Sequence, residues 1–298
     1  EGRKFLIENI PTPKRSLRSL YRKKGFLPMH LFKKIRKIIN TDNLFVFWGK
    51  SILPAKLKID KDFAFLLGCW VGDGCYDRNS IIISMNDEEF LRRLKSFNEK
   101  YNFKIKKHSD GFSYMINSSL LKKLLVKIGF VGDSFTKRIP EVVFSWKKEL
   151  KAEFLKGLFS AEGWVTKYEV KLVTYSKELA NDLETLLLSF GIVARKSLRE
   201  DKLNREYVEC RISSKTFLEI FSKHIGFEQE YKKNKLNEIL KRKVHEVSDV
   251  IPLPSFLYRE LKYVFINSFK NKKTWKSWHR AYLQGRKIDR IHLLKLIE

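Results

Sequence analysis

The sequence predicts an α+β fold in which one αββαββα unit occurs twice, with small and mainly helical extensions at both ends. Two repeated features of the 298-residue chain support this prediction. Residues 63–74 (FAFLLGCWVGDG) and 154–163 (FLKGLFSAEG) are apolar stretches of helix length, and both end in a small residue, an acid and a glycine. Each is followed by a similar series of elements that closes on IGF, at residues 128–130 and 225–227. Such self-similarity indicates a duplicated unit.

The first copy begins with the helix that ends at Asp73. A β-rich run (81–85), a charged helical pattern (87–97) and a second β-like run from residue 103 follow it. The apolar pattern LKKLLVKIGF then predicts a helix that leads to Phe130. The change between alternating and helical periodicity marks each of these elements.

The second copy begins with the helix that ends at Glu162 and repeats the same order. The predicted elements are a strand at 168–176, a helix at 177–192, strands at 193–199 and 206–212, and a helix that leads to Phe227. The span from the acid to the IGF glycine is longer here than in the first copy, so the second copy carries longer loops.

These patterns divide the chain into four segments. We expect a basic N-terminal extension at 1–60, the first repeat at 61–150, the second repeat at 151–243 and a helical C-terminal appendage at 244–298. A short helix is predicted at 31–39. The appendage either binds DNA or packs on the core, and its Trp275 and Trp278 fit stacking on nucleic acid less well than a role as core anchors.

The balance of charge points to a polyanionic partner. The chain has 61 Lys and Arg against 34 Asp and Glu, a formal net charge of +27, and nucleic acid is the commonest polyanion. An anionic membrane is the competing partner, but no run of 18 apolar residues and no signal-peptide pattern occurs. We therefore expect an intracellular protein of the cytoplasm or nucleoid, from a bacterium or an archaeon. The first residue is Glu1, which suggests a chain trimmed from a longer one.

Small residues inside the two apolar helices predict close packing. Gly68 and Gly72 share one helix face, as do Gly157 and Ala161. Glycine within a helix costs about 1 kcal/mol relative to alanine, and the close approach of two helix backbones would compensate for that cost. Packed in this way, the two helices would end side by side.

The acids Asp73 and Glu162 would then lie together at the two helix C-termini. That end of a helix already carries partial negative charge, and two neighbouring carboxylates repel each other. A divalent cation removes both penalties, and hard oxygen ligands suit Mg²⁺, which can support phosphodiester hydrolysis. The alternative interpretation is a buried helix capped by Gly74 or Gly163 at C′, with an exposed acid before it.

A known family shares these motifs. LLGCWVGDG (66–74) and LKGLFSAEG (155–163) resemble the two dodecapeptide motifs of the LAGLIDADG homing endonucleases, and the similarity covers residues 60–243. KRIPEVVF (137–144) and LLLSFGIVAR (186–195) resemble segments of intein-encoded members. The resemblance implies a pseudo-twofold αββαββα pair, with two saddle-shaped antiparallel sheets in the DNA major groove.

The same resemblance implies an activity and its metal site. It implies a monomer that makes a staggered double-strand cut across the minor groove of a long asymmetric target. Asp73 and Glu162 would hold the metal ions, together with Gly72 and Ala161 beside them. Mg²⁺ would be the cofactor, Mn²⁺ would substitute for it, and Ca²⁺ would support binding without cleavage.

Family members also place a lysine near each metal site. Lys137 matches the position in intein-type enzymes. In the second repeat, alignment on IGF puts Asn234 opposite Lys137, and Lys233 or Lys235 could serve instead. We choose Lys233. A solvated surface lysine is the alternative for each.

Contacts to DNA should come from the outward-facing residues of the strands. In 103–107, Phe103 and Ile105 should point inward and their neighbours outward. Arginine can read guanine edges, and lysine mostly meets phosphate. The candidates are Lys104, Lys106, Lys171, Arg195, Arg199 and Arg211.

Two other functions fit the same fold. An RNA maturase would bind intron RNA and would not require the acids, and a DNA-binding regulator would not cut. An acid in both motifs favours the endonuclease. The sequence carries no splicing nucleophile at Glu1 and no His-Asn at its last residues, so we do not expect the chain to splice itself.

Overall fold

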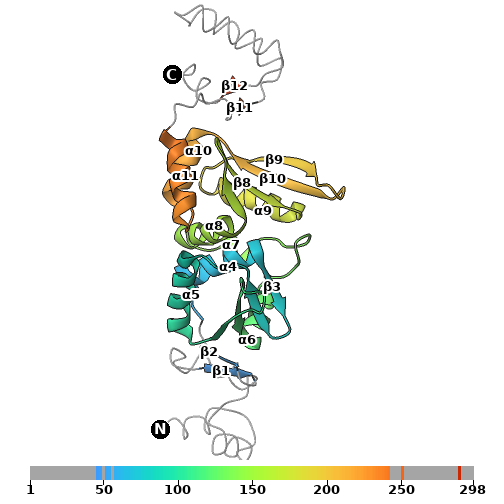
Figure 1. The fold of residues 1–298 in the computed structure, drawn as a ribbon, viewed down its shortest axis with the longest axis vertical. Coiled ribbons are helices and arrows are strands. Elements are labelled where there is room, and N and C mark those ends of the chain that lie inside the picture. Colours follow the sequence, from blue (N-terminus) through green and yellow to red (C-terminus); the bar gives the residue numbers. More distant parts are fainter. Residues whose placement is uncertain (1–44, 49–50, 55–56, 242–249, 252–287, 290–298) are drawn as a thin grey trace, which may run out of the picture. The chain divides into compact units, whose positions relative to one another are not determined.

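The computed structural model describes residues 45–48, 51–54, 57–241, 250–251 and 288–289 (Figure 1). The predicted helix at 31–39 and the positions of Trp275 and Trp278 lie outside these residues. Among the described helices, none is both long and apolar enough to cross a membrane.

The first repeat has the predicted order αββαββα. Its elements are α4 (Lys61–Asp73), β3 (Gly74–Asp77), β4 (Ser80–Ile83), α5 (Glu88–Tyr101), β5 (Lys104–Lys107), β6 (Tyr114–Asn117) and α6 (Ser119–Lys127). Local signals place the helices: the side chain of Asp60 accepts a hydrogen bond from the Phe63 amide, and Asp87 does the same for Phe90. Both acids therefore cap the helices that follow them.

The second repeat has the same order. Its elements are α8 (Lys148–Glu162), β7 (Gly163–Val165), β8 (Val170–Thr174), α9 (Lys177–Leu188), β9 (Arg195–Glu200), β10 (Glu206–Ile212) and α10 (Lys215–His224). A short helix, α7 (Glu141–Phe144), precedes it and α11 (Glu230–Lys241) follows it. The predicted boundary at 150 and 151 falls within the first turn of α8, and α11 completes the predicted second segment.

Each repeat forms one four-stranded antiparallel sheet. The strand orders are β3-β4-β6-β5 and β7-β8-β10-β9, which are the same order in repeat terms. The duplicated α+β fold is thus confirmed. The strands β3 and β7 did not emerge from the sequence, because each has four residues or fewer and begins directly after a helix.

Helices α4 and α8 form the interface between the repeats, and their glycines bring the two backbones together. A Cβ on Gly68 would overlap the carbonyl oxygen of Phe154, and a Cβ on Gly157 would overlap that of Phe65. These contacts are reciprocal, because Gly68 and Gly157 occupy the same place in the two helices, as do Phe65 and Phe154. The predicted close approach is confirmed.

The repeated IGF sequence has a packing role. The rings of Trp70 and Phe130 meet edge to face with centroids 6.1 Å apart, and those of Phe159 and Phe227 meet at 6.4 Å. Trp70 and Phe159 each lie three residues before the acid of their helix. The phenylalanine that closes each repeat therefore packs on the acid-bearing helix that opens it.

The flanking segments are described only in part. Strands β1 (Phe45–Trp48) and β2 (Ser51–Pro54) pair in antiparallel fashion, and the sequence analysis did not predict them. In the tail, β11 (Val250–Ile251) pairs with β12 (Ile288–Asp289). The sequence predicts a helical appendage over 244–298, so these two short strands were not expected; backbone pairing with a distant segment overrides the local helical pattern at Ile288 and Asp289.

Candidate active site

Asp73 and Glu162 are the last residues of helices α4 and α8. Because the helices cross closely, their C-terminal ends emerge side by side, and both acids line one cavity of about 640 Å³. Gly72 permits this arrangement, since a Cβ there would lie 2.8 Å from the Cβ of Ala161 and 3.1 Å from the Cγ of Glu162. The structure therefore brings these four predicted residues together where the helices cross.

A glycine in extended conformation follows each acid, with φ of −119° at Gly74 and −87° at Gly163. Glycine caps at C′ are typically left-handed, so the capping part of the alternative interpretation does not hold, whereas Asp73 is exposed as that interpretation expects. A Cβ on Gly163 would lie 2.8 Å from the Phe159 ring, and a Cβ on Gly74 would lie 2.5 Å from the Trp70 ring. Glycine here lets the chain pass beneath the ring and turn directly from helix into strand.

Burial raises the pKa of both carboxyl groups. The pKa of Glu162 rises to about 7 because the side chain is buried and Asp73 lies nearby, although Lys137 and Lys232 oppose the shift. The pKa of Asp73 is also raised by burial, against the effect of Lys137. A half-buried Glu162 beside the exposed Asp73, which repels it, is a poor arrangement for stability and a good one for holding a cation.

The donors around the acids fit a hard divalent cation. Two carboxylates and the neighbouring backbone carbonyls offer only oxygen, and such ligands suit Mg²⁺, which keeps several of its waters. Within the described residues, no three or more His, Cys, Asp or Glu side chains converge on a point, so a zinc-type ligand set is not found there. A bound cation would restore the ionised form of Glu162 at neutral pH.

Lys137 is buried at the C-terminal end of α4, with 5% of its surface exposed. Its Nζ donates hydrogen bonds to the carbonyl oxygens of Trp70 at 3.0 Å, Gly72 at 3.2 Å and Gly74 at 2.7 Å. The end of a helix leaves such carbonyls without partners. Burial lowers the pKa of Lys137, although the two acids oppose the shift. The side chain also lines the cavity.

Lys232 occupies the corresponding place in the second repeat, and the sequence analysis missed it. Its Nζ donates to the carbonyl oxygens of Ser160 and Gly163, both at 2.7 Å. Burial lowers its pKa to about 8, while Asp87 is the strongest opposing influence. Each acid-bearing helix therefore ends on a buried lysine that comes from the segment after its own repeat.

Lys233, the lysine chosen from the sequence, lies on the solvent side of α11. Its ammonium group pairs with Glu230 at 2.7 Å, and its side chain is 41% exposed. Successive residues of a helix point about 100° apart, so Lys232 faces the core while Lys233 faces solvent. A helical signal was present in the sequence, because Lys232, Leu236 and Ile239 share the buried face of α11. Alignment on IGF failed because the two connecting segments differ in length.

The outer face of the second sheet carries a row of large side chains. Trp164 pairs with Lys171 across β7 and β8, Lys171 with Arg211, and Arg211 with Arg195 at the edge. Alternate residues on these strands are buried, as predicted. Trp164 is 39% exposed and was not among the predicted residues.

Several of these side chains already have partners. Lys171 pairs with Glu169 at 3.1 Å, and Arg211 donates to the hydroxyl of Ser197 at 2.6 Å. Arg199 lies on the same face, 3.9 Å from Glu209. The row is therefore a pre-ordered set of polar groups.

The outer face of the first sheet is less basic. Lys104 and Lys106 are exposed on its edge strand, β5. The row that contains Lys106 continues through Met115 and Ile82 to Cys75, beside the cavity. The row on the second sheet is therefore mainly basic, and the row on the first sheet is mainly apolar. Each row runs across its sheet toward the strand that follows the acid of its own repeat.

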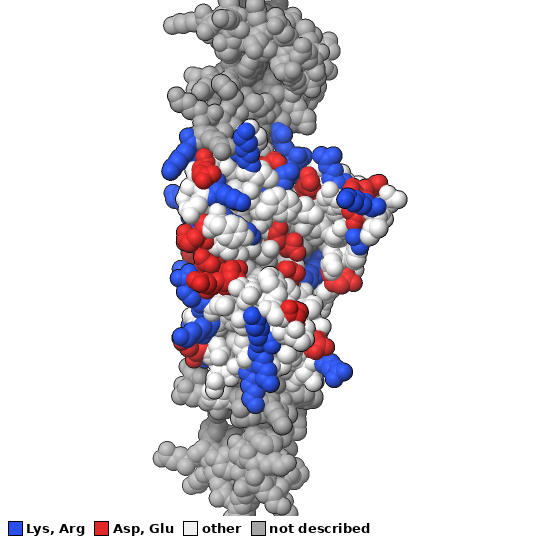
Figure 2. All heavy atoms as spheres, in the orientation of Figure 1, with Lys and Arg blue, Asp and Glu red and all other residues white. Residues whose placement is uncertain are grey.

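Basic charge is not spread evenly over the molecule. On the face shown in Figure 2, acidic side chains gather where the two repeats meet, and lysines and arginines lie mainly toward both ends of the described region.

Comparison with known proteins identifies a family. Residues 60–129 and 149–226 match the model of the LAGLIDADG-like domain. The two matched stretches correspond to the two repeats.

Three curated proteins of Methanocaldococcus jannaschii are similar to this chain. One is named probable translation initiation factor IF-2, with 30% identity over 257 residues, which is 82% of this chain and 21% of that protein. The replication factor C small subunit is 34% identical, over 64% of this chain and 11% of that protein. The DNA-directed RNA polymerase subunit Rpo1C is 29% identical, over 68% of this chain and 24% of that protein. The chain spans less than a quarter of the length of each.

Solved structures also resemble this one. The homing endonuclease I-DmoI, in complex with DNA and Mn, is 19% identical with a TM-score of 0.43, over 55% of this chain and 96% of that one. Full-length DUF199/WhiA from Thermatoga maritima is 17% identical with a TM-score of 0.43, over 70% of this chain and 66% of that one.

Proposed function

This chain belongs to the LAGLIDADG family, and from that premise we propose that it is a homing endonuclease that cuts both strands of DNA at one long, asymmetric target. The supporting observation is the pair of acids at the ends of two packed helices, with one buried lysine beneath each. This arrangement is duplicated, as a reaction on two strands requires.

The proposed cofactor is Mg²⁺, with Mn²⁺ as a substitute and Ca²⁺ as an ion that supports binding only. Asp73 and Glu162 would hold it, with the backbone at Gly72 and Ala161 beside them. When bound, the cation would lower the pKa of water and stabilise the leaving oxygen in phosphodiester hydrolysis. The raised pKa of Glu162 supports this assignment, since a nearby cation would favour the ionised form of that carboxyl group near neutral pH.

The buried lysines supply fixed positive charge. Lys137 and Lys232 are each anchored by carbonyl oxygens, so neither ammonium group has to reorganise when negative charge develops on a phosphate. Their lowered pKa values also make proton exchange with water easier near neutral pH. We propose Lys137 and Lys232 as the catalytic lysines, one for each strand.

The sheets would bind DNA through their outer faces. In the second sheet, Arg195 and Arg211 could read guanine edges and Lys171 could meet phosphate. In the first, Lys104 and Lys106 would hold the backbone, while the partly exposed Met115 offers an apolar contact. The unlike faces suit an asymmetric target read by one chain, so we propose a monomer.

A selection from randomised DNA tests this proposal. The purified chain is incubated with a pool of long randomised duplexes and Mg²⁺, and the cut ends are sequenced, with Asp73→Asn/Glu162→Gln as the control. Staggered cuts at one long site, absent in the control, support the endonuclease. Tight duplex binding without cuts would replace it by a non-cutting DNA-binding protein. Preference for structured RNA over every duplex would favour a maturase.

The origin of the chain is a second proposal. The similar proteins are named for translation initiation, replication and transcription, and the chain matches only a minor part of each. A segment shared by otherwise unrelated proteins suggests a mobile insertion. Because the segment is part of the protein sequences themselves, an intein-encoded enzyme is favoured over an intron-encoded one. Sequencing the gene around this chain decides the point: one reading frame that continues into a host protein on both sides supports an intein.

A further inference from the structure

The segment that carries Lys137 is held by both repeats. Its side chain binds the end of α4, but its carbonyl oxygen accepts a hydrogen bond of 2.6 Å from the hydroxyl of Ser176, in the second repeat. The next two residues are fixed from the same side, because Asp182 on α9 pairs with Arg138 at 3.2 Å and accepts the amide of Ile139 at 3.1 Å. Ser176 is fully buried.

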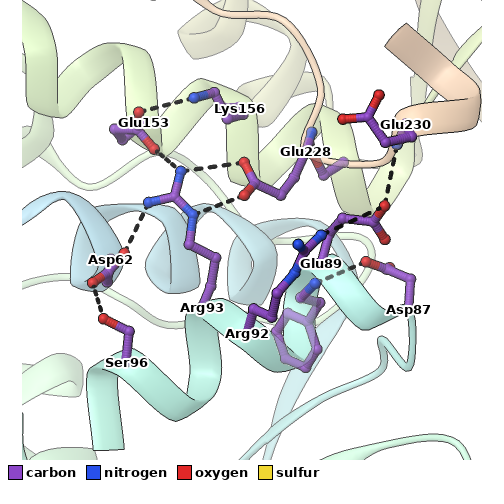
Figure 3. Close-up of polar contacts among 12 residues, drawn as sticks. Asp62, Asp87, Glu89, Arg92, Arg93, Ser96, Glu153, Lys156, Glu228 and Glu230 are labelled. Atoms are coloured by element: carbon purple, nitrogen blue, oxygen red, sulfur yellow. Dashed lines mark hydrogen bonds and ion pairs between the residues drawn. The ribbon is translucent and has the colours of Figure 1, made fainter. Parts of the chain in front are cut away.

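The segment that carries Lys232 is held in the same crossed manner. Nε2 of Gln229 donates to the carbonyl of Ser160, which Lys232 also binds, and to the carboxylate of Asp87 at 3.1 Å in the first repeat. One residue earlier, Glu228 pairs with Arg93 on α5 at 2.9 Å (Figure 3). Gln229 is 3% exposed, so this contact lies in the protein interior.

The two connections are related by the internal duplication. Asp87 and Ser176 are the N-caps of α5 and α9, and they lie at the same sequence distance from the acid of their own repeat. Arg93 and Asp182 also correspond, with opposite charge. The residue types differ between the repeats. Each repeat nevertheless holds the lysine-bearing segment of the other through its helix N-cap and through the residue six positions after that cap.

We propose that Ser176 and Gln229 are positioning residues, through which each repeat sets the lysine that serves the other repeat's acid-bearing helix end. This inference rests on the proposed endonuclease function. It follows that neither lysine is in place until both repeats have docked, so the two strand cuts share one assembled site. It also follows that breaking one connection should impair one lysine and one strand.

Strand-specific nicking is the first test. The variant Ser176→Ala removes the hydroxyl that donates to Lys137 and also accepts from the Leu179 amide. The variant Gln229→Met removes the amide that donates to Ser160 and Asp87, and it keeps the side-chain volume. On a supercoiled plasmid with the selected target, we expect each variant to cut one strand about tenfold more slowly and to accumulate nicked circles, with the slow strand opposite in the two variants. A merely structural role would slow both strands equally, and that result would overturn the proposal.

Two further variants make the comparison sharp. Ser214→Ala removes the hydroxyl of another buried N-cap serine of the second repeat, whose side chain makes no capping bond, and it should cut both strands at the parental rate. Ser176→Thr keeps the hydroxyl and should restore the slow strand at least in part. If Ser176→Ala and Gln229→Met show no more strand bias than Ser176→Thr, the result counts against the connections.

Hydrogen exchange without metal gives an independent measurement. In EDTA, Ser176→Ala should speed amide exchange at residues 131–139 at least severalfold and leave 227–234 unchanged, and Gln229→Met should do the reverse. Parental exchange in both variants would overturn the proposal whatever the cleavage result. If the parent cuts no duplex, the endonuclease function fails, and this exchange pattern alone decides whether the crossed connections exist.

Discussion

The α-carbon of Gly68 faces the carbonyl oxygen of Phe154 so closely that a Cβ would overlap it. This contact joins the two repeats, and the equivalent contact of Gly157 with Phe65 repeats it across the interface. The candidate site depends on the same contact, since the two helices deliver their acids to one cavity only if their backbones touch.

The variant Gly68→Ala should therefore be strongly destabilising. The added methyl group would press against a backbone atom that cannot move aside, which should reduce the free energy of unfolding by about 3 kcal/mol. This loss exceeds the stabilisation that alanine gives through its higher helix propensity. Urea denaturation followed by circular dichroism measures the change. Gly111→Ala is the matched control, because open space surrounds Gly111 and only its positive φ of 74° carries a cost, of about 1 kcal/mol. Equal effects of the two variants would contradict the packing argument.

The variant Asp73→Asn should abolish double-strand cleavage and leave binding largely intact. Loss of a charged metal ligand removes several kcal/mol of transition-state stabilisation, or about a thousandfold in rate. Cleavage of the selected target with Mg²⁺ and gel-shift binding with Ca²⁺ measure the two properties separately. Undiminished cutting would remove Asp73 from the proposed metal site.

The buried carboxyl of Glu162 should make stability depend on pH when no metal is present. Its pKa of about 7 lies above the ordinary value of 4.5, so the folded state binds the extra proton. This contribution is fully present below about pH 4.5 and is lost as the pH rises through 7. In EDTA at pH 8, Glu162→Gln should be more stable than the parent by about 2 kcal/mol, and the difference should vanish at pH 4.5. Mg²⁺ should raise the melting temperature of the parent only.

The two neighbouring lysines of α11 should behave differently. Lys232→Met should reduce cleavage by about a hundredfold, because the helix end that carries Glu162 loses its buried cation. Lys233→Met should stay within about twofold of the parent, since it breaks only a surface ion pair with Glu230. Single-turnover cleavage rates at saturating enzyme provide the comparison. The reverse order would restore the assignment made from the sequence.

Arg93 should contribute more to stability than any surface arginine. It binds Asp62 at 2.8 Å, Glu153 at 2.9 Å and Glu228 at 2.9 Å, and so links both repeats (Figure 3). Arg93→Met removes the only cation that the described residues place against Glu228, whereas Asp62 and Glu153 keep their ion pairs with Lys100 and Lys156, and the variant should cost about 3 kcal/mol. The adjacent Arg92→Met, at an exposed side chain, should change the free energy of unfolding by less than about 0.5 kcal/mol. Thermal and urea denaturation of both variants test this difference.

Local patterns in the sequence determined the helices that end at Asp73 and Glu162, the duplication and the close approach at Gly68 and Gly157. These features depend on periodicity and residue size, which act over a few residues and can be read without a partner. The IGF sequences likewise marked the end of each repeat before their packing role was known.

Only the tertiary structure decided which basic residue lies beneath Glu162 and which residues hold it there. The direction of Lys232 depends on where α11 enters the second repeat, and neighbouring helix positions point to opposite surroundings. The contacts of Ser176 with Lys137 and of Gln229 with Asp87 join residues far apart in the chain. They arise when the two repeats dock, and no local pattern of the sequence encodes that arrangement.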